Sequence, residues 1–120
     1  MPVTVIKKSE MSWQQIPGAS GGQTELSEAV GTSMSETIGA GLVRVEDTRL
    51  KRKLGYDEIL YILKGSMDVE TEEGETLTAE EGDFLYLPKG ATPTYVWKDP
   101  CFMHYTIFPS NWEDLMEDPE

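Results

Sequence analysis

The chemistry of this chain is expected to centre on Glu58, which stands at the start of the apolar run in YDEILYILKG, residues 56–65. A carboxyl group can act as a general acid or base, or it can ligate a metal ion. Zinc and iron sites usually also draw on imidazole or thiolate ligands, and the chain contains one histidine, His104, and one cysteine, Cys101. A site made of one imidazole and carboxylates would bind these metals poorly. We therefore expect no metal and no other cofactor.

Cys101 stands alone, which excludes an intrachain disulfide and a multi-cysteine zinc site. No basic residue adjoins it to favour the thiolate. We interpret it as a small buried hydrophobe on a strand rather than as a reactive thiol.

The composition indicates one soluble domain. Hydrophobic residues make up 38% of the 120 residues, and no apolar run approaches the roughly 18 residues that suggest a membrane span. The N-terminal MPVTVIKKSE lacks the apolar stretch of a signal peptide, so a cytoplasmic location is expected. The net charge is −12, from 22 acidic and 10 basic residues, and it would repel phosphate backbones and anionic lipids. Neither nucleic acid nor a membrane is an expected partner.

Short β-rich runs broken by turns predict an all-β fold from residue 38 onward. Polar and apolar residues alternate in GLVRVEDT, residues 41–48, and in SMDVETE, residues 66–72, which is typical of strands with one wet face. Glycine turns at residues 72–76 and 79–83 place three strands at hairpin spacing. Residues 1–37 are expected to form an irregular lead-in with a short strand at residues 3–7. Residues 38–109 form the core, and residues 110–120 form an acidic tail with one helical turn capped by Ser110 or Asn111.

The run ILYIL, residues 59–63, is apolar on both faces of a strand, so each face is expected to pack against another part of the protein or another subunit. The second cover is either the N-terminal segment or another subunit. We favour a homodimer.

Two spacings resemble the motifs of the cupin superfamily of small antiparallel β-barrels or jelly rolls. Glu58 precedes Gly65 in EILYILKG, and Gly82 precedes Pro88 and Gly90 in GDFLYLPKG. At a finer level the chain is similar to the C-terminal cupin domain of EutQ-type ethanolamine-utilisation proteins. This similarity is carried by Gly39, Gly41, Tyr56, Asp57, Glu58, Gly65, Pro88, Lys89, Gly90, Tyr105, Pro109, Asn111 and Trp112.

The resemblance implies a barrel that has lost its metal ligands. Metal-binding cupins carry a histidine pair just before the glutamate and another histidine shortly after the second motif. Here those places hold Arg52 with Leu54, or Lys51 with Lys53, and then Pro93. The EutQ-like group shares this departure, so a metal-independent cupin is expected.

A cupin register would point Glu58 into the barrel together with Leu60 and Ile62, opposite Pro93, Tyr95 and Trp97. The hypothesis is that Glu58 is a general acid or base to which Tyr56 or Tyr105 donates a hydrogen bond. The alternative is that Glu58 merely ties the barrel mouth to a backbone N–H or to Arg52. Tyr105 shares strand parity with Met103 and Ile107 and is expected in the cavity. His104 has the opposite parity, which favours a packed or surface imidazole.

The remaining candidates would bind the ligand. Either Arg52 or Lys53 could face the vacated metal position and attract an anion, although solvation is the plainer interpretation of this basic run. Tyr86, Tyr95 and Trp97 are expected as pocket wall or core. The predicted ligand-binding set is Arg52, Lys53, Tyr86, Tyr95, Trp97 and His104.

The sequence thus predicts an EutQ-like cupin that binds a small polar or anionic metabolite and is linked to ethanolamine or related microcompartment metabolism. Its expected partners are that ligand, a second copy of the chain and microcompartment-associated proteins. An alternative is a non-catalytic dimeric docking or sensing module. Acetate kinase-like activity is implied by the family alone, because the chain contains no G-x-x-x-x-G-K-[ST] phosphate loop.

Overall fold

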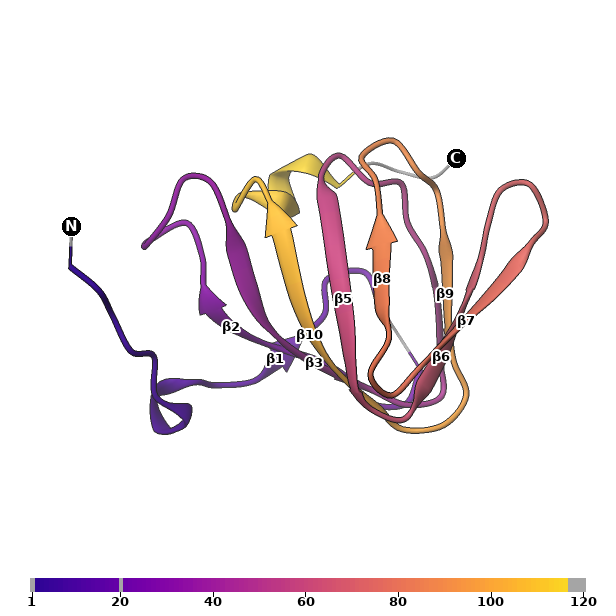
Figure 1. The fold of residues 1–120 in the computed structure, drawn as a ribbon, viewed down its shortest axis with the longest axis horizontal. Coiled ribbons are helices and arrows are strands. Elements are labelled where there is room, and N and C mark those ends of the chain that lie inside the picture. Colours follow the sequence, from indigo (N-terminus) through magenta and orange to yellow (C-terminus); the bar gives the residue numbers. More distant parts are fainter. Residues whose placement is uncertain (1, 20, 117–120) are drawn as a thin grey trace.

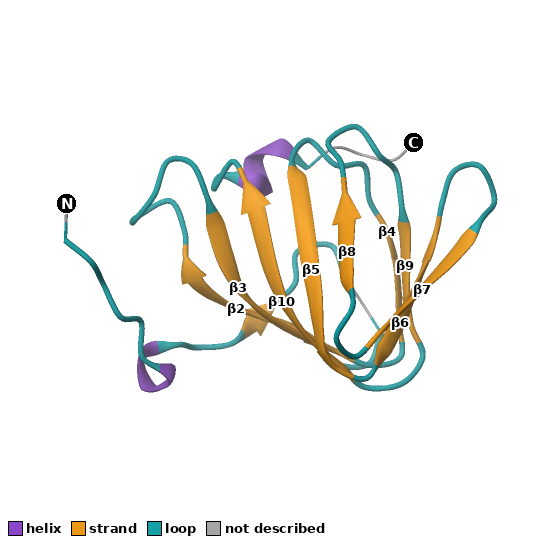
Figure 2. Cartoon of the chain, in the orientation of Figure 1, coloured by secondary structure: helices purple, strands orange, loops and turns teal. Residues whose placement is uncertain are grey.

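The computed structural model describes residues 2–19 and 21–116, and it confirms an all-β fold (Figure 2). The strands are β1 (Gln14–Gln15), β2 (Thr24–Val30), β3 (Gly39–Val45), β4 (Thr48–Lys51), β5 (Asp57–Lys64), β6 (Ser66–Glu70), β7 (Thr76–Glu80), β8 (Phe84–Leu87), β9 (Thr94–Trp97) and β10 (Cys101–Phe108). Two short 3-10 helices are η1 (Lys8–Glu10) and η2 (Trp112–Leu115). Among the described residues there is no helix with the length and apolar character to cross a membrane.

Two antiparallel sheets face each other around the core (Figure 1). One sheet has the order β1-β2-β3-β10-β5-β8, and the other has the order β4-β9-β6-β7. Strands distant in sequence are neighbours in both sheets, so the chain passes repeatedly from one sheet to the other. This is the jelly-roll arrangement expected from the sequence.

The alternation of β10 shows how the sequence builds the core. Cys101, Met103, Tyr105 and Ile107 are buried on the inner face, whereas His104 and the other even-numbered residues lie on the outer face. The expected burial of Cys101 is confirmed, and burial raises the pKa of its thiol to about 11. The inward parity of Met103, Tyr105 and Ile107 follows from the two-residue period of a strand.

The two glycine turns behave differently. The first joins β6 and β7 as a hairpin, as expected. The second does not make a hairpin, because it carries the chain from β7 in one sheet to β8 in the other, where β8 pairs with β5. Turn composition alone does not distinguish these outcomes, since both turns need only a reversal of direction.

The lead-in is more ordered than the sequence suggests. The strand expected at residues 3–7 does not form, and β2 instead lies in the polar stretch TELSEAV, where it pairs with β3. Thr24 and Ser27 are buried beside Leu26. Because these buried residues are polar, the sequence of β2 lacks the alternation of apolar and polar residues that predicts a strand.

The C-terminal helical turn is confirmed as η2. Its cap residue Asn111 makes no side-chain capping bond, and Ser110 instead donates a 2.6 Å hydrogen bond to the carbonyl of Ser35. Residues 117–120 of the predicted acidic tail lie outside the described part of the chain.

The run ILYIL has one covered face. Leu60 and Ile62 are buried against the opposite sheet, whereas Ile59 is 43% exposed and Leu63 is 37% exposed on the outer face. The neighbouring Phe84 is exposed as well. The described N-terminal segment therefore leaves this outer face uncovered.

Candidate functional site

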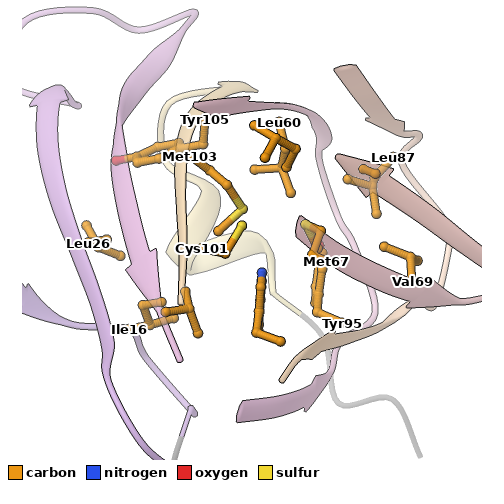
Figure 3. Close-up of a cluster of buried hydrophobic side chains, with 14 of the residues drawn as sticks. Ile16, Leu26, Leu60, Met67, Val69, Leu87, Tyr95, Cys101, Met103 and Tyr105 are labelled. Carbon is orange, nitrogen blue, oxygen red and sulfur yellow. The ribbon is translucent and has the colours of Figure 1, made fainter. Parts of the chain in front are cut away.

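A small cavity lies between the two sheets, with walls from both. Its volume is about 60 Å³, which is room for roughly four to six water-sized groups. Figure 3 shows Leu60 and Met103 from one sheet and Met67 from the other pointing into the same interior. The polar side chains of the wall are those of Arg52 and Glu58, and its aromatic residues are Tyr56, Tyr95, Trp97, Tyr105 and Trp112.

Glu58 is bound by a tyrosine of the facing sheet. The hydroxyl of Tyr95, on β9, donates a 2.7 Å hydrogen bond to Oε1 of Glu58, on β5. The ring of Tyr95 stacks on Trp97 with centroids 5.4 Å apart and planes 6° apart, which fixes its orientation. Tyr56 and Tyr105, the donors that the sequence predicts, both line the cavity, but neither donates a hydrogen bond to Glu58. Tyr95 reaches Glu58 because it projects across the gap between the sheets.

The cavity disfavours the charged form of Glu58. Desolvation by burial raises the pKa of this carboxyl group, while the Tyr95 hydrogen bond and the Arg52 charge partly offset the rise. Glu58 is half-buried as a residue, and its carboxyl group is packed closely enough for desolvation to dominate the shift of its pKa. In the described structure no hydrogen bond reaches its second oxygen, Oε2. That oxygen is available to a bound molecule.

Arg52 is the cation of the basic run that enters the cavity. It is 9% exposed, and its guanidinium donates a hydrogen bond to the carbonyl of Pro17 in the lead-in. It forms no ion pair with Glu58 in the described structure, yet its charge lowers the pKa of Glu58. Lys53, the other candidate, is exposed and does not line the cavity, because it follows Arg52 on the opposite parity. Its exposure agrees with the interpretation of this basic run as solvated.

Two buried donors in the cavity wall lack partners. Trp97 Nε1 and the Tyr105 hydroxyl make no hydrogen bond within the described residues. Both side chains are buried, with 5% of Trp97 and 4% of Tyr105 exposed. Burial first, and then the carboxylates of Glu28, Glu58 and Glu113, raise the pKa of Tyr105, so its hydroxyl stays protonated. An unpaired buried donor costs roughly 1–3 kcal/mol, and it calls for a specific explanation.

Aromatic residues close the remaining wall. Tyr56 meets Trp112 edge to face, with ring centroids 6.0 Å apart. Trp112 belongs to η2 and joins the cavity wall, together with Ile16 and Leu26 from the lead-in. The sequence prediction did not place these three residues in the site. Only Trp112 carried a signal, as part of the motif shared with the EutQ-type proteins.

Two further residues of the predicted ligand-binding set lie outside the cavity wall. Tyr86 is 64% exposed and pairs with Ile59 on the outer face of the sheet. His104 is exposed on the same face, 3.4 Å from the hydroxyl of Thr106. Strand alternation turns both side chains away from the cavity, so neither contacts Glu58.

The donor set does not fit a first-row transition metal. Arg52 contributes a guanidinium, which is no metal ligand, and Pro93 at the second expected position has no ligating side chain. In residues 2–19 and 21–116, no three side chains of His, Cys, Asp or Glu come together as a metal group. We derive no metal-dependent step at this site.

Residues 2–114 match the model of the family described as "Ethanolamine utilisation protein EutQ". The chain is 28% identical over 113 residues to "Acetate kinase EutQ" of Escherichia coli K12, covering 94% of this chain and 48% of that protein. The chain thus spans about half the length of the curated relatives it matches.

Solved structures share the fold. A crystal structure of an ethanolamine utilization protein Q from Salmonella typhimurium LT2 has a TM-score of 0.81 and 28% identity, covering 91% of this chain and 88% of that one. An RmlC-like cupin from Shewanella frigidimarina has a TM-score of 0.73 at 13% identity, covering 90% of this chain and 92% of that one. The second similarity shows the fold alone.

Proposed function

The chain belongs to the EutQ family of ethanolamine utilisation proteins and has their cupin fold, and on this premise we propose that its barrel cavity binds one small polar or anionic metabolite. The observation that carries this proposal is the pair of unpartnered buried donors, Trp97 Nε1 and the Tyr105 hydroxyl, in the wall that also contains Glu58. A ligand acceptor atom that bonds either donor would recover the desolvation cost of that donor.

Size and charge narrow the ligand class. A cavity of about 60 Å³ accepts a molecule, or the end of a molecule, with about four to six non-hydrogen atoms. Arg52 supplies a positive charge to the same cavity wall, which favours a carboxylate or another acceptor-rich group. Stacked aromatic rings cover the rest of such a ligand with apolar surface.

Glu58 is the proposed acid–base group. Burial raises its pKa, which favours the protonated form, so it can hold a proton and transfer it to a ligand. Tyr95 fixes Oε1 and leaves Oε2 to exchange a proton with the ligand. Tyr56 and Tyr105 orient the ligand by hydrogen bonding and packing. A ligand-sensing module would use the same contacts without the proton transfer.

The outer face of the six-stranded sheet supports a homodimer. Ile59, Leu63 and Phe84 are exposed large hydrophobic residues on neighbouring strands, and a second copy would cover them. We place the protein in the cytoplasm, in contact with the microcompartment proteins of ethanolamine or related metabolism.

We do not extend the acetate kinase name of the relatives to this chain. The sequence contains no phosphate-binding loop of the G-x-x-x-x-G-K-[ST] type, and the chain covers about half of those proteins.

The proposal is tested by a thermal-shift screen of small acids, amines, amides and nucleotides, together with metal analysis of the purified protein. A ligand for the cavity raises the melting temperature of the wild type and has a smaller effect on Glu58→Gln. His104→Ala, on the outer face, is the matched control and keeps the full response. A stoichiometric transition metal in the purified protein would contradict the metal-independent part of the proposal.

A further inference from the structure

The cavity between the sheets contains a cationic and an acidic side chain that do not pair with each other. Arg52 and Glu58 both belong to its wall, and within the described residues no ion pair joins them. Arg52 donates instead to the carbonyl of Pro17, and Oε1 of Glu58 accepts from the hydroxyl of Tyr95. A guanidinium has several N–H donors. Arg52 therefore keeps donors for an anion, and Oε2 of Glu58 can still form a hydrogen bond.

The cavity is too small to keep a bound anion away from Glu58. Its volume of about 60 Å³ holds a ligand with about four to six non-hydrogen atoms. All atoms of such a ligand lie at the wall, so an anion attracted by Arg52 also comes close to the carboxyl group of Glu58. Oε2 is the oxygen of Glu58 that is free to meet it. A carboxylate ligand thus brings two carboxyl groups together.

Two carboxylates in contact inside a protein do not both stay ionised. Their like charges repel strongly where little water screens them, and one proton held between them replaces the repulsion by a hydrogen bond. The rest of this wall is largely aliphatic and aromatic and offers little screening. The single charge of Arg52 offsets one negative charge and not two.

We propose that a carboxylate ligand binds in this cavity together with one proton, which Oε2 of Glu58 shares with a ligand oxygen. This rests on the proposed ligand site and narrows its ligand to the anion of a weak carboxylic acid. The proton comes from solvent, since Glu58 is half-buried rather than sealed. The carboxylate of Glu58, the carboxylate of the ligand and one proton form a pair with one negative charge, which Arg52 balances.

Glu58 is the group of the cavity wall that can take up this proton. The other titratable side chains of the wall are those of Arg52, Tyr56, Tyr95 and Tyr105. Burial is the largest cause that raises the pKa of all three tyrosines, so they keep their protons at neutral pH. The strands beside β5 add no titratable group, because Leu87 and Ile107 pair with Glu58 there. Two exposed carboxylates act from outside the wall, those of Glu28 and Glu113.

Proton uptake makes the affinity depend on pH in one direction. Burial raises the pKa of Glu58 in the free protein, and a bound anion would raise it further. The affinity for the ligand is therefore highest where Glu58 is already protonated in the free protein. It falls as pH rises through the pKa of Glu58 in the free protein, and the fall approaches about tenfold per pH unit for one proton.

Calorimetric titration with propionate from pH 6 to pH 9 is the test. Propionate stays ionised over this range and fits the expected size, and propionamide has the same shape without the charge. The affinity of the wild type for propionate should fall with pH, and that for propionamide should change much less. Titrations in two buffers of different ionisation enthalpy should show that propionate binding takes up protons, with the number approaching one as pH rises.

Two variants identify the group that takes up the proton. Glu58→Gln should bind propionate more weakly than the wild type at pH 6, with the same affinity at every pH and no proton uptake. Tyr95→Phe should move the fall in affinity to higher pH, because loss of its hydrogen bond raises the pKa of Glu58. His104→Ala is the matched control on the outer face and should keep the pH dependence of the wild type.

Proton uptake and ligand binding can fail separately. Propionate that binds the wild type without proton uptake, or with the same pH dependence in Glu58→Gln, would overturn the shared proton and leave the ligand site standing. Binding of propionamide without binding of propionate would overturn the carboxylate class. Failure of both compounds to bind at any pH would also overturn the shared proton, and the thermal-shift screen of other small compounds would then decide the ligand site.

Discussion

The Tyr95 hydroxyl of one sheet donates a 2.7 Å hydrogen bond to the Glu58 carboxyl group of the other. Both residues line the cavity, and the contact fixes one carboxyl oxygen. It also lowers the pKa of Glu58 against the larger rise caused by burial. Glu58 is thereby both a link between the sheets and a titratable group facing the cavity.

Glu58→Gln should change how stability depends on pH. Burial raises the pKa of Glu58 in the folded state above its unfolded value of about 4.3. The contribution of this carboxyl group to the free energy of unfolding is therefore fully present below the unfolded pKa and is lost as pH rises through the folded pKa. Glutamine stays neutral at every pH and can still accept from Tyr95. The free energy of unfolding of Glu58→Gln minus that of the wild type should therefore increase from pH 4 to pH 8, as measured by urea denaturation.

Glu25→Gln is the control of opposite sign. Arg44 lies 2.9 Å from the Glu25 carboxylate and lowers its pKa, so its stabilisation is present at neutral pH and disappears as pH falls. The free energy of unfolding of Glu25→Gln minus that of the wild type should be negative at neutral pH and approach zero in acid. If the stability difference between Glu58→Gln and the wild type does not change with pH, or changes as it does for Glu25→Gln, burial does not control the pKa of Glu58.

Tyr105→Phe should separate stability from binding. The hydroxyl has no partner in the described structure, so its removal should leave the free energy of unfolding within about 1 kcal/mol of the wild type, or raise it. A ligand that uses this hydroxyl should bind about five- to tenfold more weakly. Chemical denaturation and calorimetric titration measure the two effects. A large loss of stability would instead reveal a structural role for the hydroxyl.

Tyr95→Phe should behave differently from Tyr105→Phe, because its hydroxyl is bonded. Loss of the donor leaves Glu58 less well solvated, which should cost about 1–3 kcal/mol and raise the pKa of Glu58 further. A carbon-13 NMR titration of the glutamate side chains measures that pKa. An unchanged or lower pKa for Glu58 would contradict the geometry.

Arg52→Gln should loosen the lead-in. The guanidinium donates to the Pro17 carbonyl and lowers the pKa of Glu58, so both effects should disappear. We expect a loss of about 1–3 kcal/mol and faster amide hydrogen exchange at Ile16, whose side chain lines the cavity. Lys53→Gln is the matched control, since Lys53 is exposed and lies outside the cavity. Equal exchange in the two variants would argue against this role of Arg52.

The sequence predicts the strands of the barrel and much of the site for a physical reason. Alternation with a period of two decides which face is buried, and it correctly orients Glu58, Tyr95, Trp97 and Tyr105. The same alternation, applied to the strands of Tyr86 and His104, turns both side chains outward, so their selection as site residues relied on residue type rather than on position.

The donor to Glu58 depends on a contact between sheets, which periodicity within one strand does not predict. Tyr56 is close to Glu58 in sequence, whereas Tyr95 is 37 residues away and meets it across the cavity. Likewise, β2 was missed because Thr24 and Ser27 are polar and yet buried. Their burial is a consequence of tertiary packing.

The most direct test of the central claim compares ligand-induced melting shifts of the wild type and Tyr105→Phe in one thermal-shift screen. The account predicts that a small acceptor-rich compound, of about four to six non-hydrogen atoms, stabilises the wild type and stabilises Tyr105→Phe markedly less. Equal stabilisation of both proteins, or no stabilisation of the wild type by any compound of this class, would contradict a ligand site in the barrel.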